Sequence, residues 1–217
     1  MTHAVWHDAE EMTMPKASPR MASQAVSIPQ GRPPYDDYFM GVAYAIRERA
    51  NCLGYKVGAI LVLHDRVIST GYNGTPESMP NCDEGGCARC AKRVRSGSKK
   101  PKYKSGTGYD VCICVHAEQN ALLAAARFGI PVAGGLIYTT IQPCFGCLKE
   151  MVQARIAGVR FRHPWSHPDP SLRPQYDILK TRFSQGVKQI FTPDPREAWA
   201  LGKGVKAGDT GHPIQTR

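Results

Sequence analysis

The stretch HAEQNALLAAARFGIPVAGGLIYTTIQPCFGC, residues 116–147, alternates helix and strand signals and decides the expected fold. Its first part, 116–128, is rich in Ala and Leu and ends at a Gly and a Pro, which predicts a helix. The β-branched and apolar run 136–141 predicts a strand, and 144–156 predicts a second helix. This order of elements is typical of α/β proteins, in which helices cover a sheet.

The sequence on both sides of this stretch continues the alternation. We expect helices at 37–50 and 172–184 and strands at 57–63, 67–70, 159–162 and 188–191. The short connection 64–66 between the first two strands predicts a hairpin. Together the elements predict a three-layer α/β/α fold with a central mixed sheet.

Composition restricts the class of protein. The chain has 217 residues, 42% of them hydrophobic, which is enough for roughly one domain with its own core and excludes a disulfide mini-protein. No apolar run approaches the ~20 residues that span a bilayer, so we expect no membrane partner. Residues 1–31 show no secretory signal. Eight cysteines without an export signal predict a cytoplasmic protein whose thiols bind metal or do chemistry.

Changes in composition divide the chain into three parts. Residues 1–34 are rich in Met, Pro, Ser and Gln without periodicity, which predicts a flexible leader. The folded domain is expected at 35–191, with a Cys-rich and basic insertion at 80–110. Gly, Pro and charged residues dominate 192–217, which we interpret as a C-terminal tail.

One constellation of residues carries the chemistry. His116, Cys144 and Cys147 supply three ligands and leave a fourth tetrahedral position open, as a catalytic zinc ion requires. Both ligand groups fall at predicted helix starts, where the helix dipole favours thiolate over thiol. Glu118 lies two residues from a ligand and is the expected general acid/base. Alone, Cys144-x-x-Cys147 could be a redox pair or half of a structural zinc site, and His116-x-Glu118 could arise by chance; together they favour a catalytic site.

These motifs resemble a known signature. His116-Ala117-Glu118 followed by Pro143-Cys144-x-x-Cys147 resembles the signature of the zinc-dependent cytidine deaminase-like superfamily. The stretches that resemble its deoxycytidylate (dCMP) deaminase branch are Tyr38-Phe39-Met40, Val57-Gly58-Ala59, Gly71-Tyr72-Asn73-Gly74, His116 to Ala121 and Tyr138-x-Thr140. The likeness covers residues 35–165. It implies the cytidine deaminase-like version of the α/β fold for the domain at 35–191.

The resemblance also implies roles for individual residues. His116, Cys144 and Cys147 would hold the zinc ion, and Glu118 would protonate N3 of a cytosine ring and then the departing ammonia. The backbone N–H of Ala117 would contact the carbonyl group of the base. Residues Val57, Gly58 and Ala59 would form the wall of the substrate pocket. Asn73 would contact the sugar or phosphate, although Asn-Gly also makes a good turn in its own right.

The expected function is hydrolytic deamination of a free cytosine nucleotide, dCMP to dUMP with release of ammonia. Two alternatives remain. The first is a deaminase of another nucleotide or base, or of tRNA or single-stranded DNA. The second is a non-catalytic, zinc-bearing competence or nucleic-acid-binding protein, against which the retained Glu118 argues. The resemblance further implies a homo-oligomer, a hexamer or a dimer.

The insertion contains a second group of cysteines. Cys82, Cys87 and Cys90, completed by Cys112 or Cys114, would give a closed structural zinc site that orders a loop with little apolar surface to bury. In the alternative interpretation, Cys112 and Cys114 are small buried residues on a short strand. Cys52 could pack nearby or join the site, and the sequence does not decide between these.

The same insertion carries seven Lys or Arg and no acidic residue between Lys92 and Lys104, within a chain of net charge +10. Such a run is typical of a solvated loop. It could also attract an anionic nucleotide or bind nucleic acid.

Overall fold

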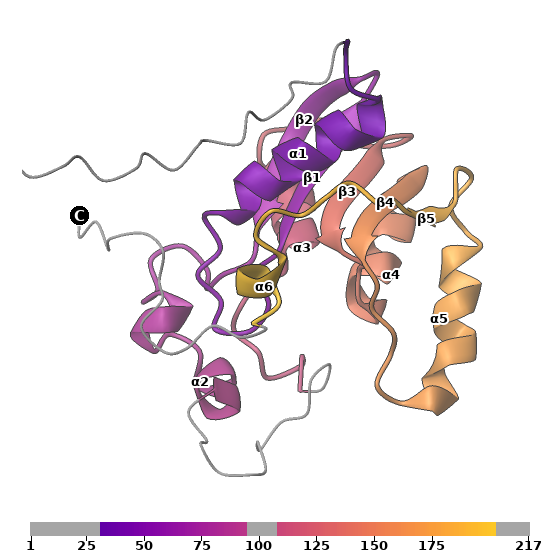
Figure 1. Ribbon diagram of the computed structural model, residues 1–217. Coiled ribbons are helices and arrows are strands. Elements are labelled where there is room, and N and C mark those ends of the chain that lie inside the picture. The colour runs from indigo at the N-terminus through magenta and orange to yellow at the C-terminus, as the bar shows by residue number, and fades with distance from the viewer. Residues whose placement is uncertain (1–30, 95–107, 203–217) are drawn as a thin grey trace, which may run out of the picture. The chain divides into compact units, whose positions relative to one another are not determined.

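The computed structural model describes residues 31–94 and 108–202, and the compact unit within it begins at Pro33. The expected leader, 1–34, and the basic run, 92–104, lie largely outside the described residues. The elements are α1 (Tyr35–Arg47), β1 (Gly58–Leu63), β2 (Arg66–Tyr72), the 3₁₀-helix η1 (Cys82–Glu84), α2 (Ala88–Val94), α3 (Ala117–Arg127), β3 (Leu136–Ile141), α4 (Phe145–Gln153), β4 (Gly158–His163), the 3₁₀-helix η2 (Pro170–Leu172), α5 (Arg173–Lys180), β5 (Val187–Gln189) and α6 (Glu197–Ala200) (Figure 1).

The five strands form one mixed sheet in the order β2-β1-β3-β4-β5. Strand β1 is antiparallel to both β2 and β3, whereas β3, β4 and β5 are parallel. The expected hairpin joins β1 to β2 through His64 and Asp65, with φ angles of 50° and 56°. Positive φ at both turn residues is the geometry that matches the twist of the flanking strands. The mixed sheet is therefore confirmed.

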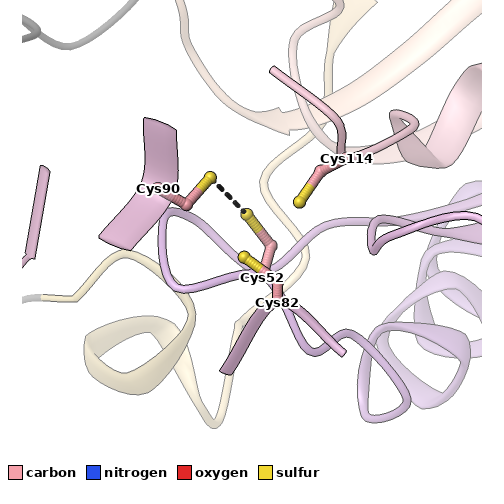
Figure 2. Close-up of side chains that lie close together, drawn as sticks. All are labelled: Cys52, Cys82, Cys90 and Cys114. Atoms are coloured by element: carbon pink, nitrogen blue, oxygen red, sulfur yellow. Dashed lines mark hydrogen bonds between the residues drawn. The ribbon is translucent and has the colours of Figure 1, made fainter. Parts of the chain in front are cut away.

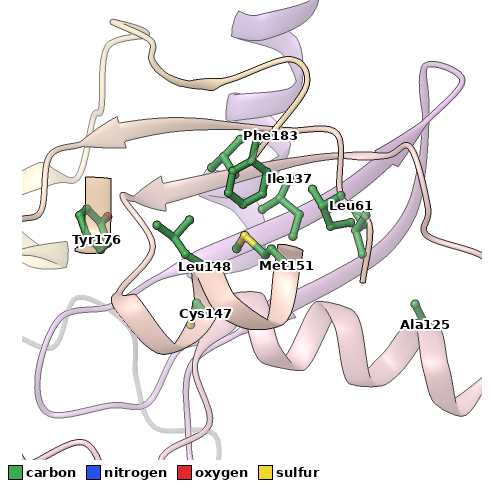
Figure 3. Packing of buried hydrophobic residues seen from close by; sticks show 10 residues of the cluster. Leu61, Ala125, Ile137, Cys147, Leu148, Met151, Tyr176 and Phe183 are labelled. Carbon is green, nitrogen blue, oxygen red and sulfur yellow. The ribbon is translucent and has the colours of Figure 1, made fainter. Parts of the chain in front are cut away.

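Helices cover both faces of the sheet, which confirms the three layers (Figure 1). On β1, Ile60 and Val62 pack with α1, and Leu61 packs with the opposite layer, as the two-residue period of a strand requires. That opposite layer contains α3, α4 and α5. Its buried side chains meet around Met151 and Leu148 of α4 (Figure 3). In the described ranges, no helix has the length and apolar content to cross a bilayer.

Two glycines allow helices to approach the sheet closely. A Cβ on Gly58 would lie 2.3 Å from the carbonyl oxygen of Ala43 in α1. A Cβ on Gly71 would lie 2.1 Å from the carbonyl oxygen of Ala117 in α3. The first turn of α3 is therefore held against β2 by direct backbone packing, which only glycine permits.

The observed helix ends differ from the expected ones. The expected helix at 37–50 ends as an α-helix at Arg47, because the N–H groups of Glu48, Arg49 and Ala50 bond to carbonyls three residues back. The apolar periodicity of the sequence continues through these 3₁₀-type turns. The helix expected from that periodicity is therefore longer than the α-helix observed. The helix expected at 172–184 likewise ends at Lys180.

Two stretches contain more structure than their composition indicates. The insertion, expected as a loop, contains η1 and α2, both next to buried cysteines. Residues 192–202, interpreted as part of the tail, contain α6 and contact α1: the Tyr44 hydroxyl donates to the carbonyl of Thr192 at 3.0 Å. The folded part of the chain therefore continues beyond 191.

Candidate active site

The expected ligands meet where two helices begin. His116 is the N-cap of α3 and Cys144 is the N-cap of α4, and both have extended ψ angles, 158° and 173°. Cys147 lies in the first turn of α4. The N-cap position directs each side chain off the end of its helix, so the two helix starts present their ligands to the same point.

The spacing of these three side chains fits a tetrahedral zinc ion. The Nδ1 atom of His116 lies 3.4 Å from the Sγ atoms of both Cys144 and Cys147, and the two sulfurs lie 3.6 Å apart. With ordinary zinc–ligand bond lengths, the edges of a tetrahedron are about 3.6 Å for N···S and about 3.8 Å for S···S. The residues present therefore fit the metal.

Glu118 lies beside this cluster as expected. Glu118 is only 4% exposed, and its Oε2 atom lies 3.8 Å from the sulfur of Cys147. Burial raises the pKa of Glu118 to about 7. The neighbouring thiol of Cys147, together with the His116 ring, lowers the pKa of Cys144 to about 4, which favours the thiolate that a metal ion needs.

A residue that the sequence interpretation missed joins the two helix starts. The Oε1 atom of Gln119 accepts the backbone N–H of His116 at 3.0 Å, and its Nε2 donates to Glu150 of α4 at 2.8 Å. The Gln119 side chain thus links the start of α3, which carries His116, to Glu150 of α4. The position of Gln119, three residues after an N-cap, is the signal that could have identified it.

His116, Cys144 and Glu118 line a cavity whose empty space, with the open solvent at its mouth, is about 610 Å³. Of the pocket residues implied by the resemblance, Val57, Asn73 and Ala117 lie on its wall. Gly58 and Ala59 do not, which corrects that expectation. Both are paired in β1, and Gly58 packs against α1 rather than the cavity.

Asn73 is engaged in the turn that follows β2. Its Oδ1 accepts the N–H of Val57 at 2.8 Å and its Nδ2 donates to the carbonyl of Tyr55 at 2.7 Å. Both partners belong to the segment that forms one side of the cavity. Asn73 therefore shapes the wall through the backbone, and one Nδ2 hydrogen is left for another contact.

The cavity wall also contains residues that were not expected, among them Arg89, Tyr109, Gln142 and Trp165. The guanidinium of Arg89 lies 5.3 Å above the ring of Tyr109. Trp165 packs on Tyr176 with ring centroids 5.3 Å apart, in the loop that follows β4.

The structure gathers all six remaining cysteines beside this cavity. Cys52, Cys82, Cys90 and Cys114 form one group with sulfurs within 4.8 Å of one another (Figure 2). A second group within the same limit consists of Cys87, Cys90, Cys112 and Cys114. No described strand contains Cys112 or Cys114, so the interpretation of these two as strand residues is wrong. Cys52, left undecided by the sequence, belongs to the first group.

Comparisons with known proteins identify the family of this chain. The family model for the cytidine and deoxycytidylate deaminase zinc-binding region matches residues 33–162, and the chain belongs to this family. Deoxycytidylate deaminase of Schizosaccharomyces pombe is 41% identical over 128 residues, which are 59% of this chain and 37% of that protein. Deoxycytidylate deaminase of Saccharomyces cerevisiae is 34% identical over 168 residues, 77% of this chain and 49% of that protein. The chain thus spans at most about half the length of these relatives.

A solved structure shows the same architecture. The crystal structure of dCMP deaminase from the cyanophage S-TIM5, in complex with dCMP and dUMP, aligns with a TM-score of 0.54 and 26% sequence identity. The alignment covers 74% of this chain and 99% of that one. The cytidine deaminase-like fold expected from the motifs is thereby confirmed.

Proposed function

We propose that this chain is a zinc-dependent deaminase that converts dCMP to dUMP and ammonia. The observation that carries the proposal is the convergence of His116, Cys144 and Cys147 beside a buried carboxylate, Glu118. Two of the ligands, His116 and Cys144, and Glu118 itself line one cavity. The names of the two yeast relatives and of the phage structure support dCMP as the substrate.

A zinc ion held by the three ligands would supply an activated water molecule near neutral pH. The remaining work is proton transfer, and Glu118 is placed to do it. The water oxygen would add to C4 of the cytosine ring as N3 takes a proton. The bond from C4 to the amino nitrogen would break in a later step, once that nitrogen is protonated, and C4 would keep the oxygen as its carbonyl. Glu118 carries one proton of the water to ring N3 and the other to the amino group, which leaves as ammonia.

Other residues on the wall favour a nucleotide over a free base. Arg89, Tyr109, Gln142 and Trp165 all line this cavity. Arg89 brings a positive charge to it, which suits the phosphate of a nucleotide. The backbone N–H of Ala117 would bond to the base carbonyl, and the free hydrogen of Asn73 would contact the sugar or phosphate.

We also propose a cytoplasmic homo-oligomer. None of the eight cysteines forms a disulfide, which suits a reducing compartment. Helix α3 exposes 59% of Leu123, and its C-cap residue Phe128 is 71% exposed; covering both by a second copy would remove apolar surface from water. Light scattering after size-exclusion chromatography tests the assembly: a single peak at the mass of a dimer or hexamer supports it, and a monomer peak contradicts it.

The test of the activity is production of dUMP and ammonia from dCMP by the zinc-loaded protein. Glu118→Gln is the matched variant because it keeps the size of the side chain but cannot carry the proton. We expect turnover in the wild-type chain and a loss of at least about 100-fold in the variant, at unchanged zinc content. Absence of turnover on dCMP contradicts the substrate, and turnover on labelled tRNA or single-stranded DNA instead would support the polynucleotide alternative.

A further inference from the structure

The six cysteines outside the active site form two overlapping groups. Cys52 and Cys82 belong only to the first group, and Cys87 and Cys112 belong only to the second. Cys90 and Cys114 belong to both. Five of the six residues are at most 6% exposed, and Cys112 is partly buried.

The distances between the sulfurs are those of metal-bound thiolates. Sγ of Cys90 lies 3.8 Å from the sulfurs of both Cys52 and Cys112, and Cys87 and Cys112 lie 3.9 Å apart. A disulfide would bring two sulfurs to about 2.05 Å. The edge of a tetrahedral zinc–thiolate site is about 3.8 Å. In each of the two groups, the sulfur–sulfur distances given above therefore match the edge of a tetrahedral zinc–thiolate site.

One four-coordinate ion cannot use six thiols. It would leave two cysteines of the cluster without a metal bond, whichever group it occupied. Two ions that share one edge of their tetrahedra need six sulfurs, of which two bridge. The pair common to both groups, Cys90 and Cys114, is the shared edge that this arrangement requires.

The surroundings suit such a cluster. Two zinc ions and six thiolates leave a net charge of about −2. The Nη1 atom of Arg89 lies 4.0 Å from the sulfur of Cys90. The backbone N–H groups of Leu53 and Gly54 point at the sulfurs of Cys82 and Cys52, each at 3.4 Å. Positive charge and N–H donors around thiolates stabilise their ionised form.

We propose that the six cysteines bind two zinc ions in a binuclear cluster, with Cys90 and Cys114 as bridging ligands. The cluster joins the segment after α1, the helices η1 and α2, and the loop before His116. Cys52, Cys112 and Cys114 also line the cavity, so the cluster forms part of its wall.

Metal counting tests the proposal without reference to catalysis. Native mass spectrometry and elemental analysis of the full chain should give three zinc ions per chain, two in the cluster and one at the active site. Cys144→Ser, which removes an active-site ligand, should reduce the count to two. A wild-type count of two or fewer in zinc-saturated protein overturns the binuclear cluster and leaves the proposed deaminase unaffected.

Variants in the two groups locate the ions. Cys82→Ser and Cys87→Ser each remove a ligand of a different ion, so each should retain two zinc ions, and Cys90→Ser should retain only the active-site ion. X-ray absorption at the zinc edge of the wild-type chain decides the matter even if a variant does not fold. A metal neighbour in the second shell supports two bridged ions, and its absence overturns them.

Discussion

Arg89 is the residue on the cavity wall best placed to contact the phosphate of the proposed substrate. It is 5% exposed, and among the described residues that line the cavity it is the only Lys or Arg. A charge removed from water interacts more strongly with an anion than an exposed charge does. Its planar guanidinium presents paired N–H donors that match two phosphate oxygens side by side, a geometry that the ammonium group of a lysine lacks.

We therefore predict that Arg89→Gln raises KM for dCMP by at least about tenfold, because a hydrogen bond to a charged group contributes about 1.5–3 kcal/mol. Deoxycytidine, which has no phosphate, should be turned over by both proteins with equal kcat/KM. Steady-state kinetics on the two substrates measure this difference.

The control for that prediction is Arg127→Gln, since the Arg127 side chain is 71% exposed and pairs with Glu77 on the surface. It should leave both substrates unaffected. An equal loss on dCMP and deoxycytidine in Arg89→Gln, or a lower zinc count, would mean that Arg89 supports the cysteine cluster beside it and does not read the phosphate.

At the level of single residues, the sequence identifies those candidate site residues that lie within short motifs. His116, Cys144 and Glu118 lie in motifs that identify them. Arg89 could not be identified, because its place on the cavity wall depends on an insertion without periodicity. Gly58 was assigned to the wall by the resemblance, as part of the run Val57-Gly58-Ala59, but it is paired in β1 and packs against α1.

At the scale of elements, the strands and main helices follow from hydrophobic periodicity, and β3 has the expected bounds. Helices α2 and α6 are short and lack an apolar face long enough to show a period. What holds α2 is the cysteine cluster, whose members are far apart in the chain. The sequence indicates that these cysteines gather, but it carries no periodic pattern that predicts a helix between them.

The packing of α3 on β2 gives a second prediction. Gly71→Ala would place a Cβ 2.1 Å from the carbonyl of Ala117 and force the first turn of α3 away from the sheet. Because that turn carries Glu118 and follows His116, we expect a loss of active-site zinc and a destabilisation of about 1–3 kcal/mol. Zinc content and urea unfolding measure the two effects.

Gly41→Ala is the control for this change, because a Cβ at Gly41 in α1 meets nothing within 4 Å. Alanine in a helix is more stable than glycine by about 0.8–1.0 kcal/mol, so this variant should be slightly more stable than the wild type. A Gly71→Ala protein that matches Gly41→Ala in stability and zinc content would contradict the close packing.

A third prediction concerns removal of metal. Dialysis against a strong chelator should release the segment Cys82–Val94 while the sheet stays folded, because the sheet has its own core and the segment depends on its thiolate ligands. Trypsin should then cut after Arg89 and Lys92, as mass spectrometry of the fragments would show. Cys144→Ser, with its cysteine cluster intact, should resist cleavage at both residues. Equal resistance of the chelated protein would show that the segment folds without metal.

At the scale of the whole folded unit, the C-terminal segment returns to α1. Arg47 donates two hydrogen bonds to the carboxylate of Asp194, at 2.7 and 2.8 Å, across 147 positions of sequence. His163 of β4 lies 2.8 Å from the same carboxylate. Asp194 thus joins the C-terminal segment both to helix α1 and to strand β4. No local pattern reveals such a pair, so the sequence analysis placed 192–217 in a tail.

This pair leads to the last prediction. The side chains of Arg47 and Asp194 are 1% and 0% exposed, so Asp194→Asn leaves a buried guanidinium without its counter-charge. Breaking a buried pair from one side costs about 3–5 kcal/mol, and we expect the urea midpoint to fall accordingly. Asp177→Asn is the control, because that side chain is 62% exposed and pairs only with Lys180, one turn away. It should change stability by less than about 0.5 kcal/mol.

The pH dependence of stability shows whether the negative charge of Asp194 stabilises the fold. Burial acts to raise the pKa of Asp194, but hydrogen bonds from Arg47, His163 and the N–H of Arg196 outweigh it and lower that pKa below its ordinary value of about 3.9. Tyr44 also faces this carboxylate. A lowered pKa in the folded state adds stability that is complete above about pH 4 and is lost as the pH falls further, because the unfolded chain binds the proton first. Urea midpoints from pH 7 to pH 3 should therefore fall more steeply below pH 4 in the wild type than in Asp194→Asn. Parallel curves would show that Asp194 does not stabilise the fold through its charge.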